Sequence, residues 1–253
     1  MDSLKILTYI YTFIIGTCIA SFINVVIERL PKNEDFIKGR SHCDHCQRIL
    51  RWYDLIPIIS FIVLKGKCRY CQKMISKRGF MIEIFGGLIG MFCFYQFGAC
   101  LQMVLVFMMI MILLAISMID LDTMIIPDGL NVALLIISLA LMYFNQQGIV
   151  ESLLGMICVS MCMIVLNLMI TDSFGGGDIK LMGAAGIGLG WKKSLLAALI
   201  AIILAGSYSV YLLIQKKVDK KSYLAFGPYL SIGIVIAFIY GQEIIHWYLS
   251  IMI

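Results

Sequence analysis

Two aspartates stand at the ends of strongly apolar stretches, where a charged side chain needs an explanation. Asp120 ends one such stretch, and Asp178 follows a run of three glycines that precedes another. Because a bilayer penalises charge, an ionisable residue in such a position is a candidate functional residue. Two carboxylates within hydrogen-bond distance share one proton, so one acts as a base towards water and the other as an acid towards a carbonyl. The two residues therefore predict the chemistry of an aspartic protease.

The residues around Asp178 are compatible with this chemistry. Gly175 and Gly177 have no side chains, so they allow another chain to approach the acid closely. Lys180 could orient a substrate or tune Asp178, and an ordinary interfacial lysine explains it equally well. The sequence lacks the Asp-Thr-Gly and Asp-Ser-Gly motifs of soluble bilobal aspartic proteases, and its having only 3 histidines argues against Ser-His-Asp catalysis.

The interval between Arg78 and Lys180 contains no lysine or arginine. Its acidic residues are Glu83, Asp120, Asp122, Asp128, Glu151, Asp172 and Asp178. Carboxylates without countercharge beside a low dielectric must hold some protons at neutral pH. This pattern indicates either an acid/base catalytic centre or a cation pathway. Asp122 and Asp128 are also explained as interfacial helix caps, and Glu83 as a cap or a partner of Arg78.

A second chemical feature is a pair of Cys-x-x-Cys motifs separated by 21 residues. The four thiols belong to Cys43, Cys46, Cys68 and Cys71. A two-residue spacer lets both thiolates of a motif reach one zinc ion, and four thiolates leave no open position for water. The spacing therefore predicts a structural zinc site. Disulfides are the alternative, which a reducing cytoplasm disfavours, and His42 and His45 are close enough to be substitute ligands.

The composition as a whole is that of a polytopic membrane protein. Of the 253 residues, 61% are hydrophobic and 14% are charged, with a mean hydropathy of +0.96. A soluble domain carries nearly twice this share of charge. Segments long enough to span a bilayer lie near residues 6–28, 80–99, 101–119, 129–145, 149–170, 194–214 and 225–249, and a shorter run at 179–190 is marginal.

The distribution of positive charge predicts the orientation. Residues 31–80 hold 11 of the 20 lysines and arginines, and the positive-inside rule therefore puts this loop in the cytoplasm. Counting spans brings Asp120 and Asp178 to the same, cytoplasmic side. The lysines of segment 216–221 lie on the cytoplasmic side only if segment 179–190 also crosses the membrane. The positive-inside rule therefore favours eight spans. The net charge of +5 is thus mostly explained by the topology of the chain in the membrane. The basic loop can also simply face anionic lipid, and no other feature supports a nucleic-acid partner.

We therefore expect an all-α polytopic membrane protein of about eight transmembrane helices, with a small cytoplasmic zinc-knuckle domain inserted between helices 1 and 2. The expected division is a first transmembrane helix at 1–30, a tetracysteine domain at 31–79 and a transmembrane core at 80–253.

Three shorter patterns predict local structure. Gly16 and Ala20 are small residues four apart, which lets helices approach closely. The apolar run 55–64 is too short to span a bilayer, so it packs on the cysteine motifs or lies on the membrane surface. Gly227 and Pro228 mark a bend near the membrane surface, which physics alone identifies as structural.

Taken together, these residues resemble the type IV prepilin peptidases, which are membrane aspartic proteases of the Gly-x-Gly-Asp kind. The resemblance runs nearly from end to end. Besides both Cys-x-x-Cys motifs, it includes the segments 21–31, 52–57, 66–71, 120–122, 127–128, 175–181 and 226–230. The sequence departs from the family pattern at Asp44, where proline is frequent, and at Gly79-Phe80, where the second span often enters through Tyr-Pro.

The resemblance implies an endopeptidase that cleaves the basic leader from prepilins or pseudopilins after a glycine, at the cytoplasmic face of a bacterial inner membrane. It places the two catalytic aspartates at Asp120 and Asp178. It also implies N-methylation of the new N-terminus with S-adenosylmethionine, an activity of members that carry the tetracysteine domain. On this hypothesis, the residues that support the pair or bind substrate are Gly175, Gly177, Lys180, Asp122, Asp128 and Glu83.

Two other classes of function use the same features. A cation- or proton-coupled membrane transporter could use the carboxylates as a relay. A zinc-bearing membrane scaffold for pilus assembly would need no catalysis.

Overall fold

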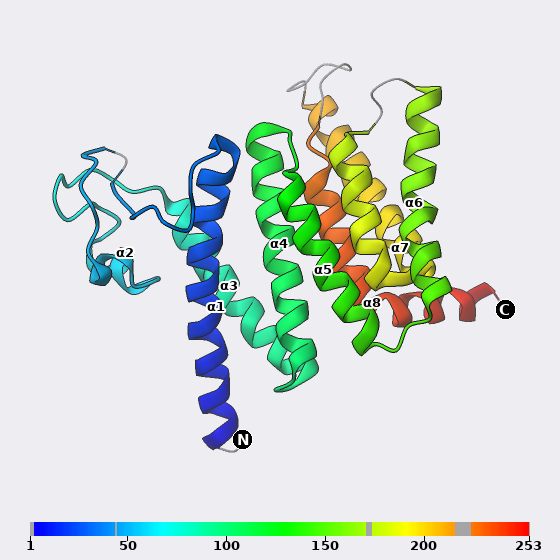
Figure 1. Ribbon diagram of the computed structural model, residues 1–253, viewed down its shortest axis with the longest axis horizontal. Coiled ribbons are helices and arrows are strands. Elements are labelled where there is room, and N and C mark those ends of the chain that lie inside the picture. Colours follow the sequence, from blue (N-terminus) through cyan, green and yellow to red (C-terminus); the bar gives the residue numbers. More distant parts are fainter. Residues whose placement is uncertain (1–2, 44, 171–173, 216–223, 253) are drawn as a thin grey trace. The chain divides into compact units, whose positions relative to one another are not determined.

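The computed structural model describes residues 3–43, 45–170, 174–215 and 224–252, and the regular secondary-structure elements of these residues are helices (Figure 1). The elements are α1 (Ser3–Arg29), η1 (Leu30–Lys32), η2 (Trp52–Leu55), α2 (Ile59–Val63), α3 (Lys77–Phe97), α4 (Leu101–Thr123), α5 (Asp128–Phe144), α6 (Ile149–Met169), α7 (Gly176–Ile214) and α8 (Gly227–Met252). No strand occurs in these ranges, and the predicted all-α class is confirmed. Asp44, Asp172 and the lysines of 216–221 lie outside the described residues.

The chain forms two compact units, Met1–Phe107 and Met108–Ile253. In the first unit, α1 and α3 pack in opposite directions through small residues. A Cβ added to Gly16 would lie 2.5 Å from the carbonyl oxygen of Gly86, and one added to Gly90 would lie 2.6 Å from that of Thr12. Ala20 also contacts Gly86. The close packing predicted for Gly16 and Ala20 is therefore confirmed.

The segment between α1 and α3 contains the cysteine motifs and two short helices. Phe61 of α2 stacks on Phe80 of α3, with ring centroids 4.5 Å apart. Ile62 and Val63 on the same short helix are 60% and 66% exposed. The apolar run predicted to lie on the motifs or on the membrane thus packs through Phe61 on the start of α3.

In the second unit, α5, α6 and α8 surround α7. The closest approach is between Gly155 of α6 and Gly186 of α7, where a Cβ on either glycine would overlap the carbonyl group of the other. A Cβ added to Gly188 of α7 would lie 3.2 Å from the Cα of Ser138 in α5. Gly233 of α8 packs on the backbone of Ala197. Because these glycines have no side chains, the helix backbones approach closely, as in other helix contacts in membranes.

The helix α7 contains a sharp reversal at Gly190. This residue has φ 74° and ψ 167°, a conformation that favours glycine. Residues before it follow α6 in the opposite direction, so that Gly190 lies beside Glu151 at the start of α6. Residues after it follow α8, where Lys193 lies beside Gly241. The 39 residues of α7 therefore make two legs, as the predicted separation of 179–190 from 194–214 requires.

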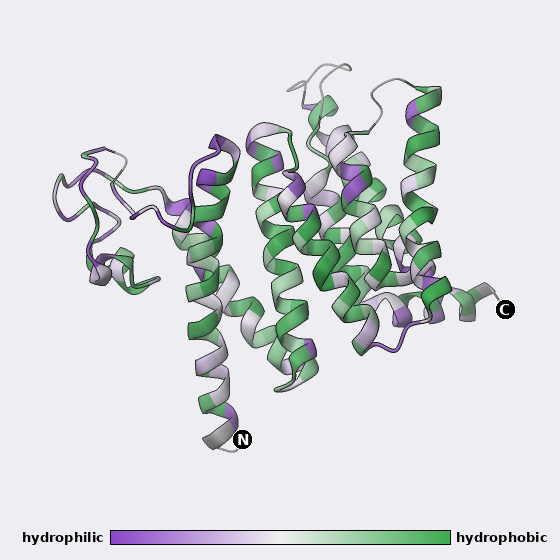
Figure 2. Cartoon of the chain, viewed as in Figure 1, coloured by the Kyte–Doolittle hydropathy of each residue, from purple (hydrophilic) through white to green (hydrophobic). Residues whose placement is uncertain are grey.

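Length and composition identify these helices as membrane spans. Among the described residues, α1, α3, α4, α6, α7 and α8 are long and apolar enough to cross a bilayer, and α5 is a shorter apolar helix of 17 residues. A straight helix of 39 residues would be about 58 Å long, nearly twice the hydrocarbon thickness. Counting both legs of α7 and including α5 gives the predicted eight. Hydrophobic residues cover most of these helices (Figure 2). The protein is a multi-pass membrane protein.

Candidate active site and candidate metal centre

The two aspartates singled out by the sequence are both buried in the second unit. Asp120 lies near the C-terminal end of α4 with 5% of its surface exposed, and Asp178 lies in the first turn of α7 with 8% exposed. The two carboxylates are near enough to interact electrostatically. The fold therefore brings together residues that are 58 positions apart in the chain.

Backbone groups hold each carboxylate by one oxygen. The N–H of Gly227, at the start of α8, donates to Oδ2 of Asp120 at 2.9 Å. The N–H of Gly175 donates to Oδ2 of Asp178 at 3.3 Å, as in a helix N-cap box. Among the described residues, the buried Oδ1 of Asp178 has no hydrogen-bond partner. That oxygen has its hydrogen-bonding capacity available to a ligand.

Glycine is required sterically at two positions of this site. A Cβ at Gly227 would lie 2.7 Å from Oδ2 of Asp120, and a Cβ at Gly177 would lie 2.8 Å from Cβ of Ile126. By contrast, a Cβ at Gly176 would meet nothing within 4 Å. Sequence reasoning identified Gly227 only as a bend. The signal that could have found it is a Gly-Pro pair at the entry of an apolar segment on the side of the acidic pair.

The predicted supporting residues take different positions. Nζ of Lys180 forms an ion pair with Oδ1 of Asp128 at 2.7 Å, and both side chains are exposed. Asp122 is exposed in the last turn of α4. Glu83 belongs to the first unit, where it accepts a hydrogen bond from the N–H of Ile58 at 2.8 Å. Ile58 has a φ of 62°, so Glu83 stabilises an unusual turn of the loop.

An apolar groove of about 380 Å³ lies between α6, α7 and α8. Phe174 and Phe226 are part of its lining, with ring centroids 5.5 Å apart. Each of these rings directly precedes a glycine whose N–H donates to a carboxylate of the pair. The groove is therefore lined by the two residues that precede the backbone donors of the acidic pair.

The four predicted cysteine ligands converge in the first unit. Their Sγ atoms all lie within 4.8 Å of one another, and those of Cys43 and Cys71 are 3.8 Å apart. A tetrahedral Zn²⁺ with metal–sulfur bonds of about 2.3 Å requires sulfur atoms about 3.8 Å apart. At 3.8 Å Cys43 and Cys71 are not disulfide-bonded. The donor set fits a four-coordinate metal ion, and neither His42 nor His45 belongs to it.

The two motifs fold as matching turns. Gln47 donates its N–H to the carbonyl of Cys43 at 2.8 Å, and Gln72 donates to that of Cys68 at 3.0 Å. Both glutamines have positive φ, 54° and 57°. In the second turn, the backbone N–H groups of Tyr70 and Cys71 donate to the sulfur of Cys68. A thiolate in such a turn is stabilised by those donors.

The thiols of the second motif differ in acidity. Backbone hydrogen bonds, mainly from Cys71, lower the pKa of Cys68 to about 7 against the opposing effect of burial. For Cys71, a backbone hydrogen bond from Lys73 lowers the pKa, but desolvation and hydrogen bonds with the neighbouring thiols raise it to about 11.

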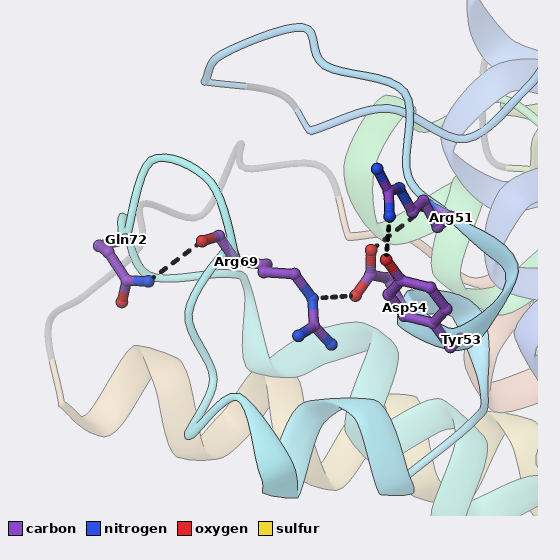
Figure 3. A network of polar contacts seen from close by, with 5 residues as sticks. All are labelled: Arg51, Tyr53, Asp54, Arg69 and Gln72. Carbon is purple, nitrogen blue, oxygen red and sulfur yellow. Dashed lines mark hydrogen bonds and ion pairs between the residues drawn. The ribbon is translucent and has the colours of Figure 1, made fainter.

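A polar network braces the second cysteine motif (Figure 3). Asp54 is 8% exposed. Its Oδ1 accepts from Nε of Arg69 at 2.7 Å, and its Oδ2 accepts from the N–H of Arg51 at 3.3 Å. Arg51 also donates to the hydroxyl of Tyr53 at 2.8 Å, and Gln72 donates to the carbonyl of Arg69 at 3.2 Å. The network links η2 to the loop that carries Cys68 and Cys71.

Two family models match the chain and together cover more than half of it. Residues 14–97 match the Bacterial Peptidase A24 N-terminal domain, and residues 106–210 match the Type IV leader peptidase family. The chain is similar to proteins called prepilin leader peptidase/N-methyltransferase. That of Stutzerimonas stutzeri is 29% identical, with 94% of this chain and 92% of the relative covered.

Two further relatives carry the same name. The protein of Legionella pneumophila is 28% identical, with 96% of this chain and 94% of the relative covered. That of Bacillus subtilis (strain 168) is also 28% identical, with 94% and 96% covered. No solved structure matches.

Proposed function

Because the chain belongs to the type IV leader peptidase family, we propose that Asp120 and Asp178 are the catalytic pair of a prepilin leader peptidase. The chain is an enzyme of a protease family whose relatives are called prepilin leader peptidase/N-methyltransferase. The observation that supports this assignment of residues is that α4 and α7 each bury a carboxylate in the same unit, near enough to interact electrostatically.

The proposed chemistry is hydrolysis by a carboxylate pair that shares a proton. One carboxylate removes a proton from water as the water oxygen attacks the scissile carbonyl carbon, and the other protonates the carbonyl oxygen. The C–N bond then breaks, and a proton passes to the departing amine. The N–H of Gly227 fixes Asp120 through Oδ2. The unpartnered Oδ1 of Asp178 is positioned to receive a ligand or water.

The proposed substrate is a prepilin or pseudopilin, cleaved after a glycine between its basic leader and its apolar segment. Asp122 and Asp128 are exposed carboxylates in the last turn of α4 and at the start of α5, and they attract the basic leader. Lys180 moderates the charge of Asp128 through its ion pair. The apolar groove beside Phe174 and Phe226 matches the apolar segment that follows the cleavage site.

We place the enzyme in a bacterial inner membrane with the acidic pair at the cytoplasmic side. The density of lysine and arginine in residues 31–80 supports this orientation. The proposed domains are helix 1 at 1–30, the tetracysteine domain at 31–79 and the peptidase core at 80–253. In a reducing cytoplasm the four cysteines hold zinc, which cross-links the loop and leaves no position for substrate.

N-methylation of the new N-terminus, with S-adenosylmethionine as the methyl donor, is the second proposed activity. A hollow of about 360 Å³ in the first unit has Glu28, Lys32, Glu34 and Gln47 in its lining. Side chains of both charge signs fit a donor that carries a positive sulfonium, an ammonium and a carboxylate. Arg29 holds the rim of this hollow by donating to the carbonyls of Asp35, Gly39 and Arg40 at 3.0 to 3.1 Å. The donor supplies the methyl group when bound.

Both activities are tested in one reaction. The purified protein is incubated with a prepilin peptide, and the products are analysed by mass spectrometry. We expect a cut directly after the leader glycine and, when S-adenosylmethionine is added, the gain of one methyl group on the new N-terminus. An intact prepilin after long incubation would instead favour a transporter that uses the carboxylates as a relay.

A further inference from the structure

A second groove in the peptidase unit contains a polar group that the proposed chemistry does not use. This groove of about 440 Å³ lies between α5, α6 and α7, a volume suited to a ligand. Its lining includes Asp128, Asn131, Leu135, Met156, Lys180 and Gly183. The Lys180–Asp128 ion pair belongs to this lining, and Lys180 follows Asp178 by two residues on the same helix.

The side-chain amide of Asn131 is buried in the wall of this groove, with no hydrogen bond found for it among the described residues. Only 5% of its surface is exposed. Within the described part of the chain, neither Oδ1 nor Nδ2 of its amide has a partner. Burying an amide without partners costs free energy, and buried polar groups in folded proteins are normally paired. An unpaired amide that lines a groove therefore indicates a ligand with a complementary donor and acceptor.

The chemistry of the amide identifies the class of ligand. Asn131 offers one donor group and one acceptor atom side by side. A peptide main chain in extended form offers the complementary C=O and N–H groups, and the apolar side chains of Leu135 and Met156 can contact its side chains. We propose that Asn131 is a positioning residue that hydrogen-bonds the main chain of the peptide substrate in this groove. This inference rests on the proposed peptidase function.

The matched pair of variants is Asn131→Leu and Ser138→Ala. Ser138 lies two turns further along α5, is 1% exposed and has an Oγ without a partner in the described residues, but it does not line the groove. Both changes remove an unpaired buried polar group, so neither should lower the melting temperature. We expect kcat/KM for prepilin to fall about tenfold in Asn131→Leu only, equivalent to about 1.4 kcal/mol.

Prepilin peptides with one amide replaced by an ester identify the bonded position. An ester removes the N–H donor at a single residue. The wild type should lose affinity for the peptide whose ester removes the partner of Asn131, whereas Asn131→Leu should bind that ester and the parent peptide equally. Binding is measured by fluorescence anisotropy in the Asp178→Asn background, in which the peptide stays intact.

The two readouts separate this inference from the peptidase assignment. Loss of peptide binding in Asn131→Leu supports the inference even if the wild type cleaves no prepilin, an outcome in which the peptidase assignment fails alone. Unchanged binding and unchanged cleavage in Asn131→Leu, with the same ester sensitivity as Ser138→Ala, would overturn it. The amide would then hold a structural water.

Discussion

Replacing Gly227 with alanine should disable the acidic pair by displacing one carboxylate. The alanine Cβ would stand 2.7 Å from Oδ2 and 3.1 Å from Cγ of Asp120, whereas ordinary contacts begin near 3.4 Å. The carboxyl group or the start of α8 must therefore move by about 0.7 Å. A displacement on the order of 1 Å can lower an enzymatic rate about 100-fold. We expect a loss in kcat between tenfold and about 100-fold, because the N–H of residue 227 remains available to Asp120.

The assay is the rate of prepilin cleavage at saturating substrate, measured together with the melting temperature. Gly206→Ala is the matched control, because a Cβ at Gly206 of α7 would meet nothing within 4 Å. Within a helix, this change should leave cleavage unchanged and stabilise the protein by about 0.5–1 kcal/mol. If Gly227→Ala cleaves at the rate of Gly206→Ala, the close approach of α8 to Asp120 has no part in catalysis.

Two further predictions concern the metal centre and the packing of the second unit. Chelation or Cys43→Ser should release one zinc per chain and lower the melting temperature before cleavage is affected. Metal analysis and thermal scans measure these two effects. Selective loss of cleavage with an intact fold would argue against a structural zinc. Gly155→Ala should destabilise the protein by about 1–3 kcal/mol through overpacking against Gly186, and a melting temperature equal to that of Gly206→Ala would contradict this packing.

The sequence was sufficient to predict the helices and the cysteine cluster, because both depend on local patterns. Apolar length predicted the spans, and the Cys-x-x-Cys spacing predicted a group of sulfurs that the structure brings within 4.8 Å. The short span ending at residue 190 was expected because the basic segments lie on the cytoplasmic side only if the chain crosses the membrane eight times. The positive φ of Gly190 allows the chain to reverse there, as this number of spans requires.

The individual residue pairs that meet between helices of the second unit could mostly not be predicted from one sequence. The pairing of Lys180 with Asp128 depends on the register of α7 against α5. The hydrophobic pattern along each helix does not determine that register. The hydrogen bond from Gly227 to Asp120 joins residues 107 positions apart, and its donor is a backbone group, so the Gly-Pro pair indicates a bend without identifying the acceptor. Asn131 is similarly ordinary in the sequence, and its burial without partners appears only when the helices are packed.

The catalytic pair is tested most directly by changing each carboxylate to the amide of the same shape. Asp120→Asn and Asp178→Asn should each lower prepilin cleavage by about 100- to 10,000-fold, since each removes one partner of an acid/base pair. Their melting temperatures should stay close to that of the wild type. Either variant cleaving prepilin at the wild-type rate would contradict the assignment of these two aspartates as the catalytic pair.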